Sequence, residues 1–83
     1  MSMARVKIPQ KMERLLHSDW KRIIREANLG REDTLIAARY ILEAVAQADI
    51  AAECNMDRST VSRRLKKIMA RLDFVAEKLG LYQ

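Results

Sequence analysis

The feature that most constrains this chain is a regular run of apolar residues in its C-terminal part. From residue 61 onward apolar side chains recur at alternating intervals of four and three; they are Val61, Leu65, Ile68, Leu72, Val75, Leu79 and Tyr82. This heptad spacing places all of them on one stripe of an α-helix. Neither glycine nor proline interrupts the run before Gly80, so the sequence predicts one helix that continues to about residue 79.

The rest of the chain predicts further helices and no strand. A second apolar periodicity begins after Pro9 and ends at Ala27, where Gly30 supplies the stop signal. Another helix is expected over about 32–45. With two glycines and one proline in 83 residues, these elements predict an all-α fold. We expect a single small domain of four helices over 1–83, with an extended C-terminal helix.

The segment before the C-terminal run has the pattern of two helices that cross closely at a short turn. The small Ala51 stands where the helices would meet, and Asn55 stands where the turn requires a positive φ. Asp57 is placed to cap the second helix by accepting from the following backbone N–H groups. The pattern predicts a helix-turn-helix at about 47–70. Its miniature core would consist of Ile50, Cys54, Met56, Val61 and Leu65.

Charge is distributed unevenly along the chain, whose net charge is +5. Residues 58–71 contain no acid; their cations are Arg58, Arg63, Arg64, Lys66, Lys67 and Arg71. A solvated helix face usually mixes both signs, whereas a stretch of one sign is typical of a surface that meets a polyanion, because each neutralised phosphate releases counterions. This distribution favours double-stranded DNA as the partner.

The helix predicted to open at Asp57 would enter the major groove. Small hydroxyls in its first turns allow close approach, and the basic side chains reach bases and phosphates. The expected base contacts are Arg58, Ser59, Ser62 and Arg63. The expected phosphate contacts are Gln47, Thr60, Lys66, Lys67 and Arg71; Gln47 is included because it begins the first helix of the motif, where the helix dipole also favours an anion.

Three resemblances support this interpretation. The run Asp57-Arg-Ser-Thr-Val-Ser-Arg63 resembles the start of the DNA-contacting helix in many bacterial regulators, including the lactose-repressor type. Over about 36–80 the layout is similar to the lambdoid phage cII-type transcription activators. The pairs Arg31-Glu32, Leu35-Ile36 and Arg39-Tyr40 resemble the helix that precedes the helix-turn-helix in the promoter-binding last region of bacterial sigma factors. The resemblances imply a phage or bacterial transcription regulator that acts on promoter DNA.

The C-terminal part of the apolar stripe needs a covering partner. Leu72, Val75 and Leu79 lie beyond the local core of the helix-turn-helix. They can pack against the N-terminal helix of the same chain, or form the oligomerisation surface of a homodimer or higher oligomer. A two-fold dimer would place its half-sites ~34 Å apart on DNA. The limited specificity of one short helix favours the dimer, whereas the short length of the stripe favours packing within one chain.

The alternative function is a protein-interaction module that uses the helix-turn-helix to contact RNA polymerase or another regulator. Such a partner would have to be strongly acidic to match residues 58–71. No enzyme is expected, because His17 is accompanied by no catalytic constellation. Cys54 is the single cysteine and has no ligands at metal spacing, so we expect neither metal nor cofactor. No apolar run approaches the ~20 residues of a membrane span, and a cytoplasmic protein without a membrane partner is expected.

Overall fold

The computed structural model describes residues 8–82, and within this range the chain contains four α-helices and no strand. The predicted all-α class is confirmed. The elements in chain order are η1 (Gln10–Met12, a 3-10 turn), α1 (His17–Ala27), α2 (Arg31–Ala37), η2 (Ala38–Leu42, a π-helical turn that continues α2), α3 (Gln47–Cys54) and α4 (Arg58–Lys78). The end of α4 lies within one residue of its predicted position.

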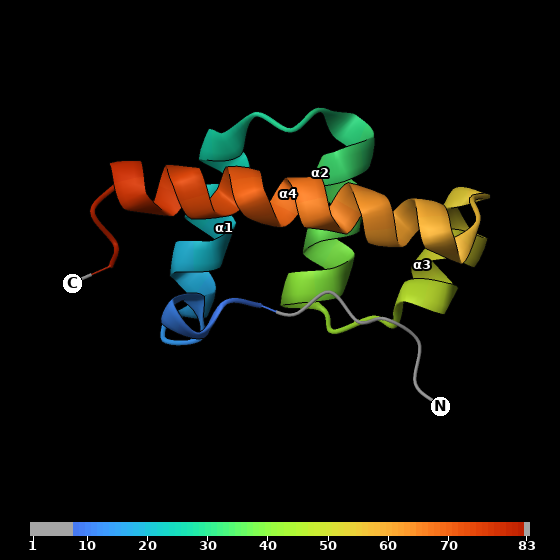
Figure 1. Ribbon diagram of the computed structural model, residues 1–83, viewed down its shortest axis with the longest axis horizontal. Coiled ribbons are helices and arrows are strands. Elements are labelled where there is room, and N and C mark those ends of the chain that lie inside the picture. Colours follow the sequence, from blue (N-terminus) through green and yellow to red (C-terminus); the bar gives the residue numbers. More distant parts are fainter. Residues whose placement is uncertain (1–7, 83) are drawn as a thin grey trace.

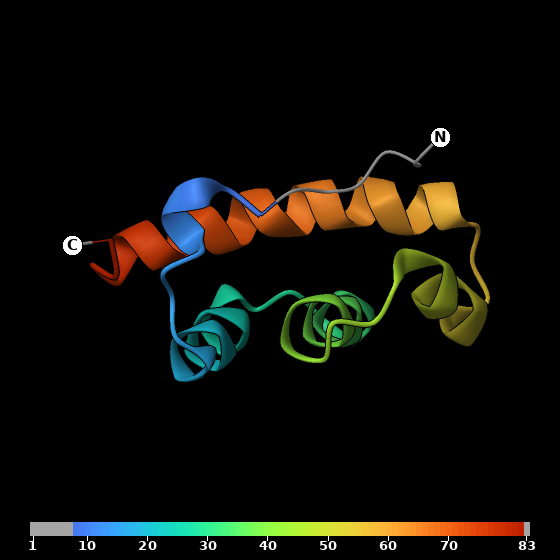
Figure 2. The same cartoon turned by 90° about the horizontal axis from the view of Figure 1, so that it is seen from below.

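The helices form two layers (Figures 1 and 2). The long helix α4 makes up one layer, with η1 beside its C-terminal half. The second layer consists of α1, the α2–η2 helix and α3, which lie side by side across α4. They follow one another from the C-terminal end of α4 to its N-terminal end, so α3 lies beside the start of α4 and α1 lies beside its last turns.

One apolar core fills the space between the layers. Each helix of the second layer buries at least one isoleucine against α4, and α4 contributes the residues that its heptad spacing predicted. Burial of each such side chain stabilises the fold by ~1.5–3 kcal/mol. The largest side chains of this core that are at most 2% exposed are Met12, Ile23, Ile36, Ile50, Val61, Leu65, Ile68 and Leu72.

The N-terminal helix begins later than predicted. The periodicity after Pro9 predicted one continuous helix, but the chain bends between η1 and α1. Met12 is completely buried, which holds η1 beside α4, while α1 crosses beneath α4. The Asp19 carboxylate accepts a hydrogen bond from the Leu16 backbone N–H at 3.0 Å and so stabilises the new helix start. The apolar spacing runs through the bend without interruption and therefore gives no sign of it.

The helix predicted over 32–45 ends at Leu42, three residues early, and its last five residues form the π-helical turn η2. The Val45 N–H bonds to the Arg39 carbonyl at 2.9 Å, and Ala44 adopts a left-handed conformation with φ of 56°. Arg39 holds this end in place. It donates to Glu43 at 2.7 Å and, through two nitrogens, to both carboxylate oxygens of Glu53 on α3 at 3.0 Å.

The C-terminal part of the apolar stripe is covered within the chain. Leu72 is completely buried and Val75 is 8% exposed, and α1 crosses α4 over this part (Figure 1). In this structure these two residues pack within the chain, the first of the two alternatives, and are not exposed as an oligomerisation surface; Leu79 is half-buried. Packing within the chain is favoured because it carries none of the translational and rotational cost of association. A dimer stays a prediction and would need another surface.

Candidate nucleic-acid interface

A three-residue connection, residues 55–57, joins α3 to α4. Asn55 adopts the predicted left-handed conformation, with φ of 60°. The Met56 N–H bonds back to the Ala51 carbonyl at 2.8 Å and ends α3. Asp57 occupies the predicted N-cap position, and its carbonyl accepts from the N–H of Thr60 at 3.0 Å. Its side chain makes no capping hydrogen bond, so the predicted carboxylate cap is wrong.

The side of α4 that faces away from the core carries a compact basic surface. Ser59, Arg63, Lys66 and Lys67 are all exposed. Arg63 follows Ser59 by four residues, and Lys66 and Lys67 follow Arg63 by three and four, which places all four on one side of the helix. We call these four residues the α4 basic face. None of its three cations forms an ion pair with any residue in the described range 8–82. Within residues 8–82, η1 is the one element that shares the layer of α4, beside its C-terminal half, and no other described element lies on this side of α4 (Figure 2).

The predicted base-contacting residues lie together on the first two turns of α4. Arg58, Ser59 and Arg63 are exposed, and Ser62 is half-buried at the edge of the same surface. An Arg63 guanidinium nitrogen lies 3.5 Å from the Thr60 hydroxyl, a weak contact that leaves most of its donors available. Their exposure leaves these side chains accessible to a partner.

The predicted phosphate contacts divide into two groups. Lys66 and Lys67 are exposed, and Gln47 and Thr60 are half-buried. Arg71 differs, because its Nε donates to the Ala27 carbonyl at the end of α1 at 3.2 Å. A cation at a helix C-terminus is stabilising, so Arg71 has a structural role in joining α1 to α4.

Arg64 belongs to the acid-free stretch of sequence but is paired with acids in space. It bonds to Glu32 at 2.7 Å and to Asp33 at 3.1 Å, both in the first turn of α2. Desolvation lowers the pKa of Arg64, but the two carboxylates outweigh it and the net shift is upward. Nothing in the sequence indicated these pairs, because Arg64 is separated from Glu32 and Asp33 by 32 and 31 positions. Arg64 is therefore paired with acids on one flank of α4 and does not belong to the α4 basic face.

Comparison with protein-family models, curated proteins and solved structures gives no match to this chain. The resemblances to phage and bacterial regulators therefore stay predictions that rest on the motif residues. Among residues 8–82, no helix is both long enough and apolar enough to cross a bilayer.

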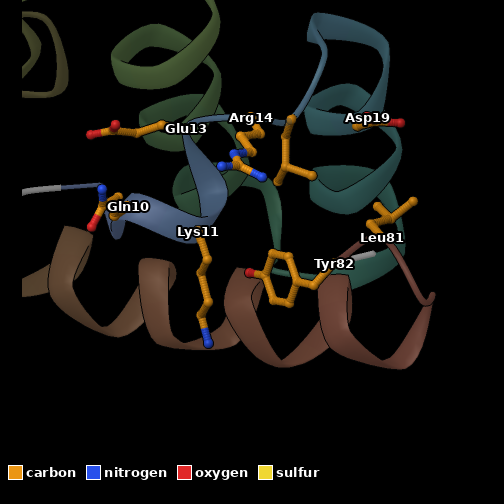
Figure 3. Close-up of a pocket in the computed structure, with 8 residues that line it drawn as sticks. Gln10, Lys11, Glu13, Arg14, Asp19, Leu81 and Tyr82 are labelled. Carbon is orange, nitrogen blue, oxygen red and sulfur yellow. The ribbon is translucent and has the colours of Figure 1, made fainter.

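A shallow depression of about 540 Å³ lies at the opposite end of the molecule, between η1 and the C-terminal segment (Figure 3). The Tyr82 hydroxyl donates to Asp73 at 2.8 Å, and Lys11 lies 3.2 Å from Asp73 and over the Tyr82 ring. Burial and the Asp73 carboxylate raise the pKa of Tyr82. These contacts hold η1 against α4 and against the segment that follows α4. Within the described part of the chain no three His, Cys, Asp or Glu side chains converge as a metal site.

Proposed function

We propose that this chain binds double-stranded DNA in a sequence-specific manner and acts as a transcription regulator of phage or bacterial type. The α3–α4 pair acts as a helix-turn-helix, and the N-terminal half of α4 enters the major groove. The observation that carries the proposal is the α4 basic face, where three exposed cations without ion-pair partners in the described chain follow an exposed serine. Unpaired cations on one helix face are suited to phosphate neutralisation.

The dimensions of α4 fit this role. A helix with its side chains is about 10–12 Å across, close to the ~12 Å width of the major groove. The small Ser59 permits close approach at the helix start. Arg63 lies one turn further along the same face and can donate two hydrogen bonds to a guanine edge. Arg58 and Ser62 flank these residues and complete the proposed base-contacting set.

The remaining contacts set the register of the protein on the duplex. Lys66 and Lys67 reach phosphates from the outer side of α4, and Gln47 reaches the backbone from the start of α3. The Thr60 hydroxyl, half-buried in the first turn of α4, is a further proposed phosphate contact. Arg71 is left out of this set because its Nε is engaged with Ala27.

The test is selection from a random-sequence duplex library at physiological salt, followed by sequencing of the retained DNA. We expect one recurring sequence motif for the wild-type chain. The variant R63Q/K66Q/K67Q should lose retention. The control variant R14Q/R31Q/K78Q removes the same charge from exposed positions elsewhere and should keep it. Retention without an enriched motif would contradict sequence specificity, and absence of retention would contradict DNA binding.

A contact with RNA polymerase or another regulator is a second candidate, favoured by Phe74. This side chain is 52% exposed on the outer side of α4, beyond the α4 basic face. The guanidinium of Arg71 and the ammonium of Lys78 lie 5.9 and 5.4 Å from its ring centroid. Aromatic and arginine side chains are enriched at protein interfaces. We expect F74A to reduce co-purification with polymerase while leaving DNA affinity unchanged; unchanged co-purification would contradict this contact.

A further inference from the structure

We infer that α1 carries a second DNA-binding face, so that one molecule bridges two duplex segments. This inference rests on the proposed function of α4. Lys21, Arg22 and Arg25 are exposed on α1, and none of them pairs with an acid in the described range 8–82. We call these three residues the α1 basic face.

The acids of α1 form no ion pair with this face within residues 8–82. Asp19 and Glu26 are seven residues apart and share one edge of the helix, next to Arg22 and away from Lys21 and Arg25. The Asp19 carboxylate is also occupied by the Leu16 backbone N–H. The opposite side of α1 is apolar and buried in the core; its residues are Trp20, Ile23, Ile24 and Ala27.

The two basic faces point in opposite directions. α1 and α4 pack against each other through their apolar sides, so the polar side of each faces outward from its own layer. Figure 2 shows α4 in the upper layer and α1 in the lower layer. The shortest dimension of the molecule, 19 Å, lies in this direction.

A duplex bound to the outer side of α4 cannot also contact the α1 basic face, because α4 lies between that duplex and α1. The cations of α1 therefore remain open in the proposed complex. A second duplex segment on this side would meet three cations within one and a half helical turns, each able to neutralise a phosphate.

A phosphate backbone fits the α1 basic face better than a protein partner does. Protein interfaces usually centre on a buried apolar or aromatic residue. The exposed large apolar side chains of the described chain lie elsewhere: Leu16 precedes α1, Leu35 is on α2 and Phe74 is on α4. The α1 basic face contains only cations, with the small Ser18 one turn before them, so it can neutralise charge without an apolar anchor.

The test uses two duplexes that have the same sequence. This sequence is the one enriched in the library selection; if no sequence is enriched, a random sequence is used. One duplex is immobilised through biotin and loaded with the 83-residue chain, and the other is fluorescent and added afterwards. Three proteins are compared: wild type, K21Q/R22Q/R25Q and the control R14Q/R31Q/K78Q. Binding to a single duplex is measured for each by anisotropy, and circular dichroism checks that each is folded.

We expect wild type and control to capture the fluorescent duplex. The α1 variant should capture at least about tenfold less, a factor that corresponds to ~1.4 kcal/mol. Its affinity for a single duplex should stay near that of the control. Wild type that binds one duplex but captures no second duplex would overturn bridging and leave the proposed function intact, whereas failure to bind even one duplex would overturn the proposed function.

Two other outcomes would also overturn the inference. Capture that persists in K21Q/R22Q/R25Q would mean that bridging arises through self-association rather than through α1. Capture of a fluorescent polyglutamate peptide, without capture of DNA, would assign the α1 basic face to an acidic protein instead.

Discussion

At the scale of single residues, Arg63 and Lys67 lie one turn apart on α4 and yet are assigned different roles. Both are exposed and without ion-pair partners in the described chain. Arg63 follows Ser59 by one turn, near the start of the helix, where a planar guanidinium can match a guanine edge. Lys67 carries a compact charge on a flexible stem, which suits a phosphate.

The division of roles predicts different losses on alanine substitution. R63A should cost about 1–3 kcal/mol on the selected sequence and relax the preference at one base position. K67A should weaken binding to all sequences alike. It should also reduce, by about 1, the steepness with which the logarithm of the binding constant falls against the logarithm of salt concentration. Titrations of selected and random duplexes at several salt concentrations measure both effects. Equal losses on both duplexes for the two variants would contradict the assignment.

Ala44 makes a second prediction at this scale, because it holds a left-handed conformation with φ of 56°. The left-handed conformation strains the backbone of an L-residue by ~1–2 kcal/mol, and glycine removes this strain. Glycine also loses more conformational entropy on folding, which cancels part of the gain. A44G should therefore raise the free energy of unfolding by about 0.5–1 kcal/mol. The control A48G places the same change on an exposed helical position and should lower it by up to ~1 kcal/mol. Urea denaturation measures both, and a destabilised A44G would contradict the expectation.

At the scale of elements, the ion pairs of Arg64 join the start of α2 to the middle of α4. If Arg64 were removed, Glu32 and Asp33 would be left as uncompensated negative charges beside α4. R64Q should therefore weaken DNA binding, although Arg64 is no proposed DNA contact. Anisotropy titration measures the loss.

The matched test of this mechanism is the triple variant R64Q/E32Q/D33N. If repulsion by the two carboxylates causes the loss, their neutralisation should restore affinity to near the wild-type value. Affinity that stays as low as in R64Q would instead show that Arg64 contacts DNA directly.

At the scale of the whole molecule, Leu72 distinguishes packing within one chain from packing between chains. It is completely buried, so L72A should cost about 2–5 kcal/mol. Because α1 of the same chain covers it, the unfolding midpoint should not depend on protein concentration. The control L35A removes a leucine that is 39% exposed and should cost much less. A midpoint that rises with protein concentration would contradict the intramolecular packing.

The long helix and its partners could be predicted because their signals are local in sequence. Heptad spacing placed α4 to within one residue, and Asn55 marked the left-handed turn before it. Side-chain geometry at the turn was harder: Asp57 has the right backbone position but makes no side-chain cap. The bend before α1 was missed because apolar residues face the core on both sides of it.

Local sequence determined the all-helical class, the bounds of α4, the turn at Asn55 and the acid-free character of residues 58–71, because helical periodicity and φ preference act over a few residues. Only the tertiary structure decided which cations remain unpaired. Arg64 meets two acids of α2 and Arg71 meets the end of α1, contacts that span 31 to 44 positions. Packing also decided that α1 covers Leu72, since two apolar surfaces of one chain can meet without the entropic cost of association.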